Sequence, residues 1–308
     1  MSMQFCYSAG VGWLKNLQSN LILTRCWSII SIVGYFAALS WTKFLSFDLV
    51  PASYRKCDDR YIFPFELLDS ESLTRLQHIQ LGFVCLRPPN QFRGFPNLKM
   101  LDLHAVCANG KDSQAMLSSC CSLEWLSLVG CLLDDVLKAD HPLPCLQYLS
   151  VANCGNGIHK IELDCMKLST FIYEGFMVPI DLSKAFKLDK VDVHFYITTL
   201  EHVITTFPNA LPNMQNMTLC GSFKPPEMSY FIESPCKFTH LKHLRLLSFL
   251  NRDVDTMSLV SFLRAAPFVE KLEIQVIFCS SFTSNHFMYL IYFYMLSTIL
   301  LQWAWWFF

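Results

Sequence analysis

Charged residues are scarce in this sequence, and their scarcity already excludes several classes of protein. Only 16% of the 308 residues are Asp, Glu, Lys or Arg, whereas 53% are hydrophobic. That balance excludes a disordered or low-complexity chain, because it supplies enough apolar surface for one large core or two modest ones. The formal net charge is −1, so the sequence lacks the basic field with which proteins bind nucleic acid or anionic membranes. We therefore expect recognition by shape and specific contacts, and no nucleic-acid partner.

The common enzyme signatures are absent as well. The sequence contains no G-x-S-x-G, G-x-x-x-x-G-K-[ST], G-x-G-x-x-G or H-E-x-x-H pattern. We therefore predict a protein that is not an enzyme, with no catalytic residues, no cofactor and no metal site.

Disulfide bonds are not expected either. The 14 cysteines make up under 5% of the chain, and no signal peptide of ordinary layout precedes them. We interpret them as reduced thiols in a cytoplasmic or nuclear protein rather than as a disulfide framework.

The central part of the chain contains a repeat. In the segment 95–103 the apolar residues Phe95, Leu98, Leu101 and Leu103 are spaced by three, three and two positions, and this spacing recurs in full or in part nine times. The third apolar residue of each unit falls at 79, 101, 126, 149, 171, 191, 217, 244 and 272, at intervals of 20 to 28 residues. Leucine-rich repeats have a period of ~20–29 residues.

The spacing has a physical meaning. The last two apolar residues of a unit alternate as in a strand, and the earlier ones turn inward from the bend that leads into it. Because one unit cannot cover its own apolar face, neighbouring units must stack. We predict an α/β fold, a leucine-rich-repeat solenoid with a parallel concave sheet and a convex side of mixed helices and loops. The segments 111–120, 198–207 and 253–266 are expected to be helices on the convex side.

The two ends differ from this region. No charged residue occurs in 26–42 or in 276–308. We divide the chain into an atypical N-terminal segment (1–35), a leucine-rich-repeat domain (36–275) and a hydrophobic C-terminal tail (276–308). A bilayer needs ~20 apolar residues, so the tail, above all 287–308, is a candidate membrane anchor.

Two cysteines fit the repeat rather than a metal site. Cys131 and Cys154 each lie three residues after the final strand position of a unit, where leucine-rich repeats place Asn or Cys to fill the turn. A metal shared by Cys120, Cys121 and Cys131 is the less favoured alternative.

The repeat also predicts a binding surface, because residues that flank the last two apolar positions point away from the core. Met100, Trp125 and Tyr148 follow one another in this register and form an apolar, aromatic patch of the kind enriched at protein interfaces. The alternative is that loops or the chain ends cover the patch. The predicted protein-binding residues on the concave face are Met100, Asp102, Trp125, Ser127, Tyr148, Ser150, Asp192 and Arg245.

Several segments together resemble the plant F-box/leucine-rich-repeat proteins of the FBD type, over about residues 36–274. They are FAALSWTKFLSFDLVP (36–51), YIFPFELLD (61–69), SCCSLEWLSLVGC (119–131), KLSTFIYEG (167–175) and SFLRAAPFVEKLEI (261–274). The resemblance implies that the solenoid recruits a protein substrate, and that an F-box docks the Skp-type adaptor of a ubiquitin ligase. Residues 1–36 contain no LPxxLL-like run, so no F-box is found and adaptor docking is not expected of this chain.

These observations favour a non-enzymatic protein-binding module that resembles the substrate-recruiting region of F-box ubiquitin-ligase receptors. Two alternatives stay open. One is a tail-anchored membrane protein with a cytosolic leucine-rich-repeat domain, and the other is a truncated gene product without a ligase role.

Overall fold

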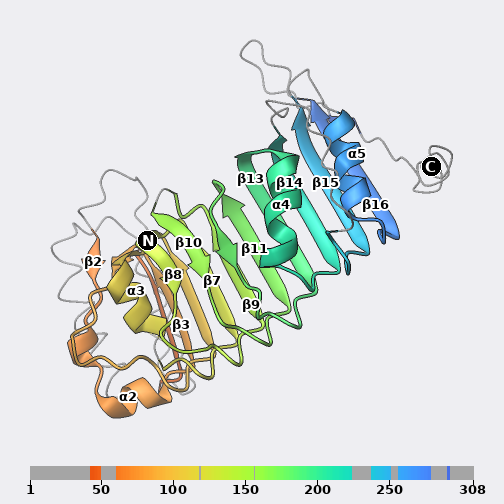
Figure 1. Cartoon of the computed structure of the whole chain (residues 1–308). Coiled ribbons are helices and arrows are strands. Elements are labelled where there is room, and N and C mark those ends of the chain that lie inside the picture. Colours follow the sequence, from red (N-terminus) through yellow and green to blue (C-terminus); the bar gives the residue numbers. More distant parts are fainter. Residues whose placement is uncertain are drawn as a thin grey trace, which may run out of the picture. The chain divides into compact units, whose positions relative to one another are not determined.

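Figure 1 shows the computed structural model of the chain, which describes residues 42–49, 60–117, 119–155, 157–223, 237–250, 256–278 and 290–291. The chain divides into two compact units. Unit 1 comprises Met1–Leu168 and Val178–Lys184, and unit 2 comprises Ser169–Met177 and Ala185–Phe308. In both units the repeat strands pair in parallel and in sequence order, which confirms the predicted leucine-rich-repeat solenoid of the α/β class.

The repeat strands of unit 1 form one parallel sheet. Each strand pairs with the next repeat strand along the chain and with no offset, so that Leu101 lies beside Leu126 and Leu126 beside Leu149. The strands are β1 (Phe44–Asp48), β3 (His78–Gly82), β5 (Met100–His104), β7 (Trp125–Val129) and β9 (Tyr148–Ala152).

A second parallel sheet forms the other side of unit 1, where only helices and loops were expected. Its strands lie between successive repeat strands in the sequence, and they range from two residues in β2, β4 and β12 to seven in β8. In spatial order they are β12 (Ile180–Asp181), β10 (Ile158–Glu162), β8 (Leu132–Lys138), β6 (Cys107–Asn109), β4 (Val84–Cys85) and β2 (Tyr61–Ile62). Helix α3 (Gly110–Leu117) packs on β6 and β8.

The repeat strands of unit 2 are longer, with six to nine residues each from β11 to β16. The sheet contains, in spatial order, β11 (Thr170–Gly175), β13 (Lys190–Thr198), β14 (Asn216–Phe223), β15 (His243–Leu250), β16 (Lys271–Phe278) and β17 (Leu290–Ile291). Strand β11 pairs with β13, β13 with β14, β14 with β15 and β15 with β16, all in parallel, whereas β16 pairs with β17 antiparallel. Helices α4 (Leu200–Ala210) and α5 (Thr256–Ala265) contact each other on one side of the sheet (Figure 1).

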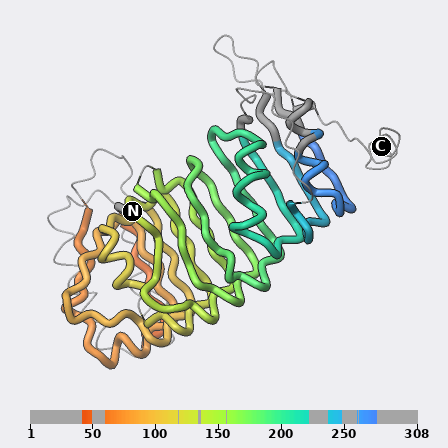
Figure 2. The backbone as a smooth tube through the Cα atoms, in the orientation of Figure 1, coloured from red at the N-terminus to blue at the C-terminus, as the bar shows by residue number. Residues whose placement is uncertain are grey.

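The apolar residues of the repeat form the core of each unit. Leu98, Leu101 and Leu103 are all at least 96% buried, and the equivalent residues of most other units are buried to the same degree. The first two apolar positions close a tight turn before most repeat strands. The Leu98 N–H donates to the Phe95 carbonyl (3.2 Å) and the Leu123 N–H to the Cys120 carbonyl (3.0 Å). Figure 2 follows the backbone through these successive turns.

The three predicted helices are present as α3, α4 and α5, within a few residues of the expected bounds. Thr199 caps α4, because its hydroxyl accepts from the His202 N–H at 3.2 Å. Two further helical turns precede β3 in unit 1. They are the 3-10 turn η2 (Phe65–Leu67) and α2 (Ser70–Arg75), which Asp69 caps by accepting from the Ser72 N–H at 2.7 Å.

The predicted N-terminal segment (1–35) lies outside the described residues, and so does most of the predicted tail (276–308). Strand β16 continues through Phe278, three residues into that tail. Within the part of the chain that the structure describes, no helix has the length and apolar character that a bilayer crossing requires.

Candidate functional site

An aromatic row crosses the open face of the unit 1 sheet, the face turned away from the core. It consists of the first residue of each repeat strand, at positions where the side chain alternates with the buried leucines. The register places these residues side by side in the order Phe44, His78, Met100, Trp125 and Tyr148. The structure thus brings the predicted residues Met100, Trp125 and Tyr148 together.

Stacked rings form one end of this aromatic row. The rings of Trp125 and Tyr148 are 3.5 Å apart between centroids and tilted by only 8°, and Trp125 remains 38% exposed. At the other end, Phe44 and His78 lie 5.8 Å apart. Such rings provide a large apolar contact area with few rotatable bonds, so little conformational entropy is lost when a partner covers them.

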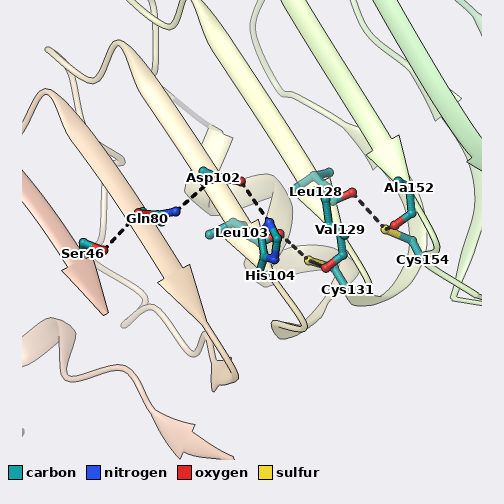
Figure 3. A network of polar contacts seen from close by, with 10 residues as sticks. All are labelled: Ser46, Gln80, Asp102, Leu103, His104, Leu128, Val129, Cys131, Ala152 and Cys154. Carbon is teal, nitrogen blue, oxygen red and sulfur yellow. Dashed lines mark hydrogen bonds and ion pairs between the residues drawn. The ribbon is translucent and has the colours of Figure 1, made fainter. Parts of the chain in front are cut away.

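A polar row lies beside the aromatic row, two positions further along each strand (Figure 3). The Ser46 hydroxyl donates to Gln80 Oε1 (3.1 Å), and Gln80 Nε2 donates to Asp102 Oδ2 (3.3 Å). The other Asp102 oxygen, Oδ1, is buried without a hydrogen-bond partner among the described residues and lies 3.8 Å from His104 Nε2. Asp102 is therefore held in place within the sheet by Gln80.

The predicted residues Ser127 and Ser150 continue the polar row on β7 and β9. Ser150 is 92% buried, so it offers a partner little surface, whereas Ser127 is partly exposed. Of the predicted polar residues of unit 1, Asp102 and Ser127 are the more accessible.

The remaining predicted residues, Asp192 and Arg245, belong to the corresponding polar row of unit 2. Asp192 lies beside Thr218 on β14, and Thr218 lies beside Arg245 on β15. A pocket of about 320 Å³ opens on this face at the start of β13, β14, β15 and β16. Its lining residues are Asp189, Lys190, Asn216, Met217, Thr218, His243, Leu244, Arg245, Lys271 and Glu273. Arg245 thus lines the pocket, and Asp192 does not.

Two short networks organise the pocket. Asn216 Nδ2 donates to Asp189 Oδ1 at 2.8 Å, and Asn216 Oδ1 lies 2.6 Å from His243 Nδ1. Lys271 Nζ contacts Glu273 Oε1 at 2.6 Å, and Arg245 Nε lies 3.5 Å from Glu273 Oε2. The hydrogen bond from Lys271 holds the pKa of Glu273 below its usual range, so this carboxylate is ionised.

A comparison with protein families identifies the repeat. The family described as "At1g61320/AtMIF1, LRR domain" matches residues 45–288, which include every described repeat strand from β3 to β16. The chain belongs to this plant leucine-rich-repeat family. No curated protein and no solved structure shows significant similarity to the chain.

Two of the repeats have a cysteine at the turn after the strand. The Cys131 thiol donates to the Leu103 carbonyl of the preceding repeat at 3.3 Å, and the Cys154 thiol to the Leu128 carbonyl at 3.6 Å (Figure 3). The interaction with the Cys154 thiol, together with burial, raises the pKa of Cys131 well above its usual value. The two thiols satisfy strand-end carbonyls between successive repeats, as the position of the two residues in the repeat predicts.

Sequence reasoning missed part of the candidate surface. Phe44 was not assigned to the aromatic row, although Leu45 and Phe47 show the alternation of a repeat strand. The hydrogen bond between Asn216 and Asp189 in the pocket was also missed, because it depends on the register of segments 27 residues apart.

Proposed function

We propose that the chain is a non-enzymatic protein-binding module that engages a protein partner through the aromatic row on its concave face. The observation that carries this proposal is the stack of exposed Trp125 on partly exposed Tyr148, on two paired strands. Leucine-rich-repeat solenoids present extended surfaces of this kind to other proteins, which the family match supports.

The composition of the aromatic row agrees with what anchors protein interfaces. Trp and Tyr are enriched among the few residues whose truncation costs the most binding energy. Here the two rings are already stacked in the free protein and lie on the paired strands β7 and β9, of which β7 is also paired with β5. A partner therefore meets an ordered surface, and binding does not have to order it first.

The finer assignment is the substrate-recruiting region of an F-box ubiquitin-ligase receptor. The segments that resemble that family, such as 119–131 and 167–175, support it, and they coincide with repeat strands β7 and β11. A substrate captured in this way is expected to accumulate when the proteasome is inhibited.

The test is affinity capture from plant extract with quantitative mass spectrometry. The double variant Trp125→Ala/Tyr148→Ala is compared with wild type and with Phe186→Ala, which removes an aromatic side chain that is 66% exposed in unit 2. We expect the genuine partner to be depleted about 30-fold or more by the double variant, since hot-spot residues contribute about 2 kcal/mol or more, and to be retained by Phe186→Ala. Equal capture by all three proteins would remove the aromatic row from the proposal.

We propose a cytoplasmic or nuclear location for this module. The nine described cysteines are free thiols, as expected in a reducing compartment. Membrane attachment through the tail is the alternative, and alkali extraction of membranes distinguishes the two. A full-length chain that resists extraction, while a chain ending at residue 275 is released, would establish the anchor.

A further inference from the structure

The pocket of unit 2 differs in chemistry from the aromatic row of unit 1. Whereas the row is apolar, the pocket is lined mainly by polar and charged side chains. We propose that this pocket binds two acidic side chains of an extended segment in the protein partner. The inference rests on the proposed protein-binding function and adds the chemical class of the segment that unit 2 recognises.

A line of hydrogen-bond donors runs along one edge of the pocket. The register places Lys190 beside Asn216, Asn216 beside His243, and His243 beside Lys271. These four residues occupy the same position in four successive strands, so their side chains leave the sheet on the same face. Lys190, His243 and Lys271 are exposed, and they are accessible to a ligand that lies across the strands.

Positive charge is in excess in the pocket. Its cations are Lys190, Arg245 and Lys271, and its carboxylates are Asp189 and Glu273. Lys271 and Arg245 share the single carboxylate of Glu273. Within the described residues, Lys190 makes no ion pair. The pocket therefore has a net charge of about +1 before any contribution from His243, and an acidic ligand is the complementary one.

The hydrogen bonds of Asn216 determine which ring nitrogen of His243 is left for a ligand. A carboxylate only accepts hydrogen bonds, so the Asn216 amide nitrogen faces Asp189 and its oxygen faces His243. His243 therefore donates from Nδ1, which leaves Nε2 available to a ligand. A neutral ring accepts a peptide N–H there, and a protonated ring donates to a carboxylate.

The spacing of Lys190 and Lys271, the two lysines of the pocket, predicts the pattern of acidic residues in the partner. Adjacent strands are ~4.8 Å apart, so Lys190 and Lys271, three strands apart, are separated by about 14 Å at their backbones. An extended peptide rises ~3.4 Å per residue, and its side chains at i and i+4 lie on one face about 14 Å apart. We therefore expect Glu or Asp at i and i+4 of the bound segment.

The experiment titrates synthetic peptides into the full-length chain and follows broadening of the peptide NMR signals. The probe is Ser-Glu-Thr-Ser-Thr-Glu-Ser, and two control peptides replace both Glu by Gln or bring the two Glu to i and i+2. Two exposed ion pairs predict that the probe binds about 3- to 30-fold more tightly than the Gln peptide. Equal binding of the probe and either control peptide would overturn the proposal.

A matched pair of variants locates the binding. Lys190→Gln/Lys271→Gln should remove the preference for the acidic probe. Lys187→Gln/Arg264→Gln removes the same charge from two exposed positions of unit 2 that do not line the pocket, and it should preserve the preference. Loss of the preference in both variants would mean a general charge effect and would contradict a site at the pocket. Displacement of the probe by an equal concentration of inorganic phosphate would likewise indicate a simple anion site.

Binding of the acidic peptide at the pocket should not depend on the aromatic row. The variant Trp125→Ala/Tyr148→Ala should bind the acidic probe as wild type does, even where it no longer captures the partner. Lost capture with retained peptide binding supports both proposals. Retained capture with absent peptide binding rejects the pocket alone.

Discussion

Neighbouring cysteines in this chain have very different environments. Cys120 closes the turn before β7 with its thiol 3.1 Å from the Met116 carbonyl, whereas Cys121, the next residue, is exposed. Burial raises the pKa of Cys120 to about 11 and that of Cys165 to about 12. The thiolate is the reactive form, so each raised pKa lowers the fraction of thiol that can react at a given pH.

We therefore predict that iodoacetamide at pH 8 modifies Cys121 in the native chain and leaves Cys120 and Cys165 unmodified. Native-state alkylation followed by tandem mass spectrometry checks this, because fragmentation separates the adjacent residues. Since the pKa of each buried thiol is raised on folding, its contribution to stability is complete below pH ~8.5 and declines as the pH rises towards 11. Protection of Cys120 that does not disappear in denaturant would contradict an origin in burial.

At the scale of the element, each repeat strand has one face that packs in the core and one face that is available to a partner. On β7, Leu126 and Leu128 point into the core and are at least 98% buried, whereas Trp125 points out and is 38% exposed. The alternation follows from the two-residue period of a strand. It separates the residues that hold the fold from those that are available to a partner.

Two alanine variants at adjacent positions should therefore differ sharply. Leu126→Ala leaves a cavity in the core and should lower the free energy of unfolding by about 2–5 kcal/mol. Trp125→Ala, which loses its stacking on Tyr148, should lower it by about 1 kcal/mol. Urea unfolding monitored by circular dichroism provides the comparison. Equal losses would place Trp125 in the core and would invalidate its use in the capture experiment.

The repeat strands could be predicted from the sequence because their signal is strong and periodic. Leu101, Leu126 and Leu149 each occupy the third apolar position of the repeat spacing, and each lies in a strand of the structure. The second sheet of unit 1 could not be predicted in this way. Strands such as β4 and β12 have two residues each, which is too short for any periodicity to appear.

The candidate surfaces were predictable to different degrees. Met100, Trp125 and Tyr148 follow from the repeat alone, because a fixed position in the repeat is a fixed position in the sheet. The place of Phe44 in the aromatic row was not predicted, because Thr42 occupies a position at which the repeat spacing requires an apolar residue. The pocket could not be predicted, because Asp189 precedes strand β13 and only the strand pairing places Asp189 next to Asn216.

At the scale of the whole molecule, stability is expected to be local. In a solenoid each repeat packs mainly on its neighbours, so stability approximates a sum of repeat and nearest-neighbour terms. The described pairings fit this, since the repeat strand β7 pairs with β5 and β9 and contributes nothing to the pairing of β1 with β3. A core defect should therefore weaken nearby repeats more than distant ones.

Hydrogen exchange tests this with one variant in each unit. Leu126→Ala should speed amide exchange most in β5, β7 and β9, with a smaller effect in β1, because β1 is two strands away from β5. Val193→Ala, at an equally buried position on β13, should act most on β11, β13 and β14. Mass spectrometry of peptic fragments reports both patterns in the same chain. If either variant accelerated exchange uniformly from β1 to β16, folding would be a single cooperative transition, and the aromatic row and the pocket could not be altered independently.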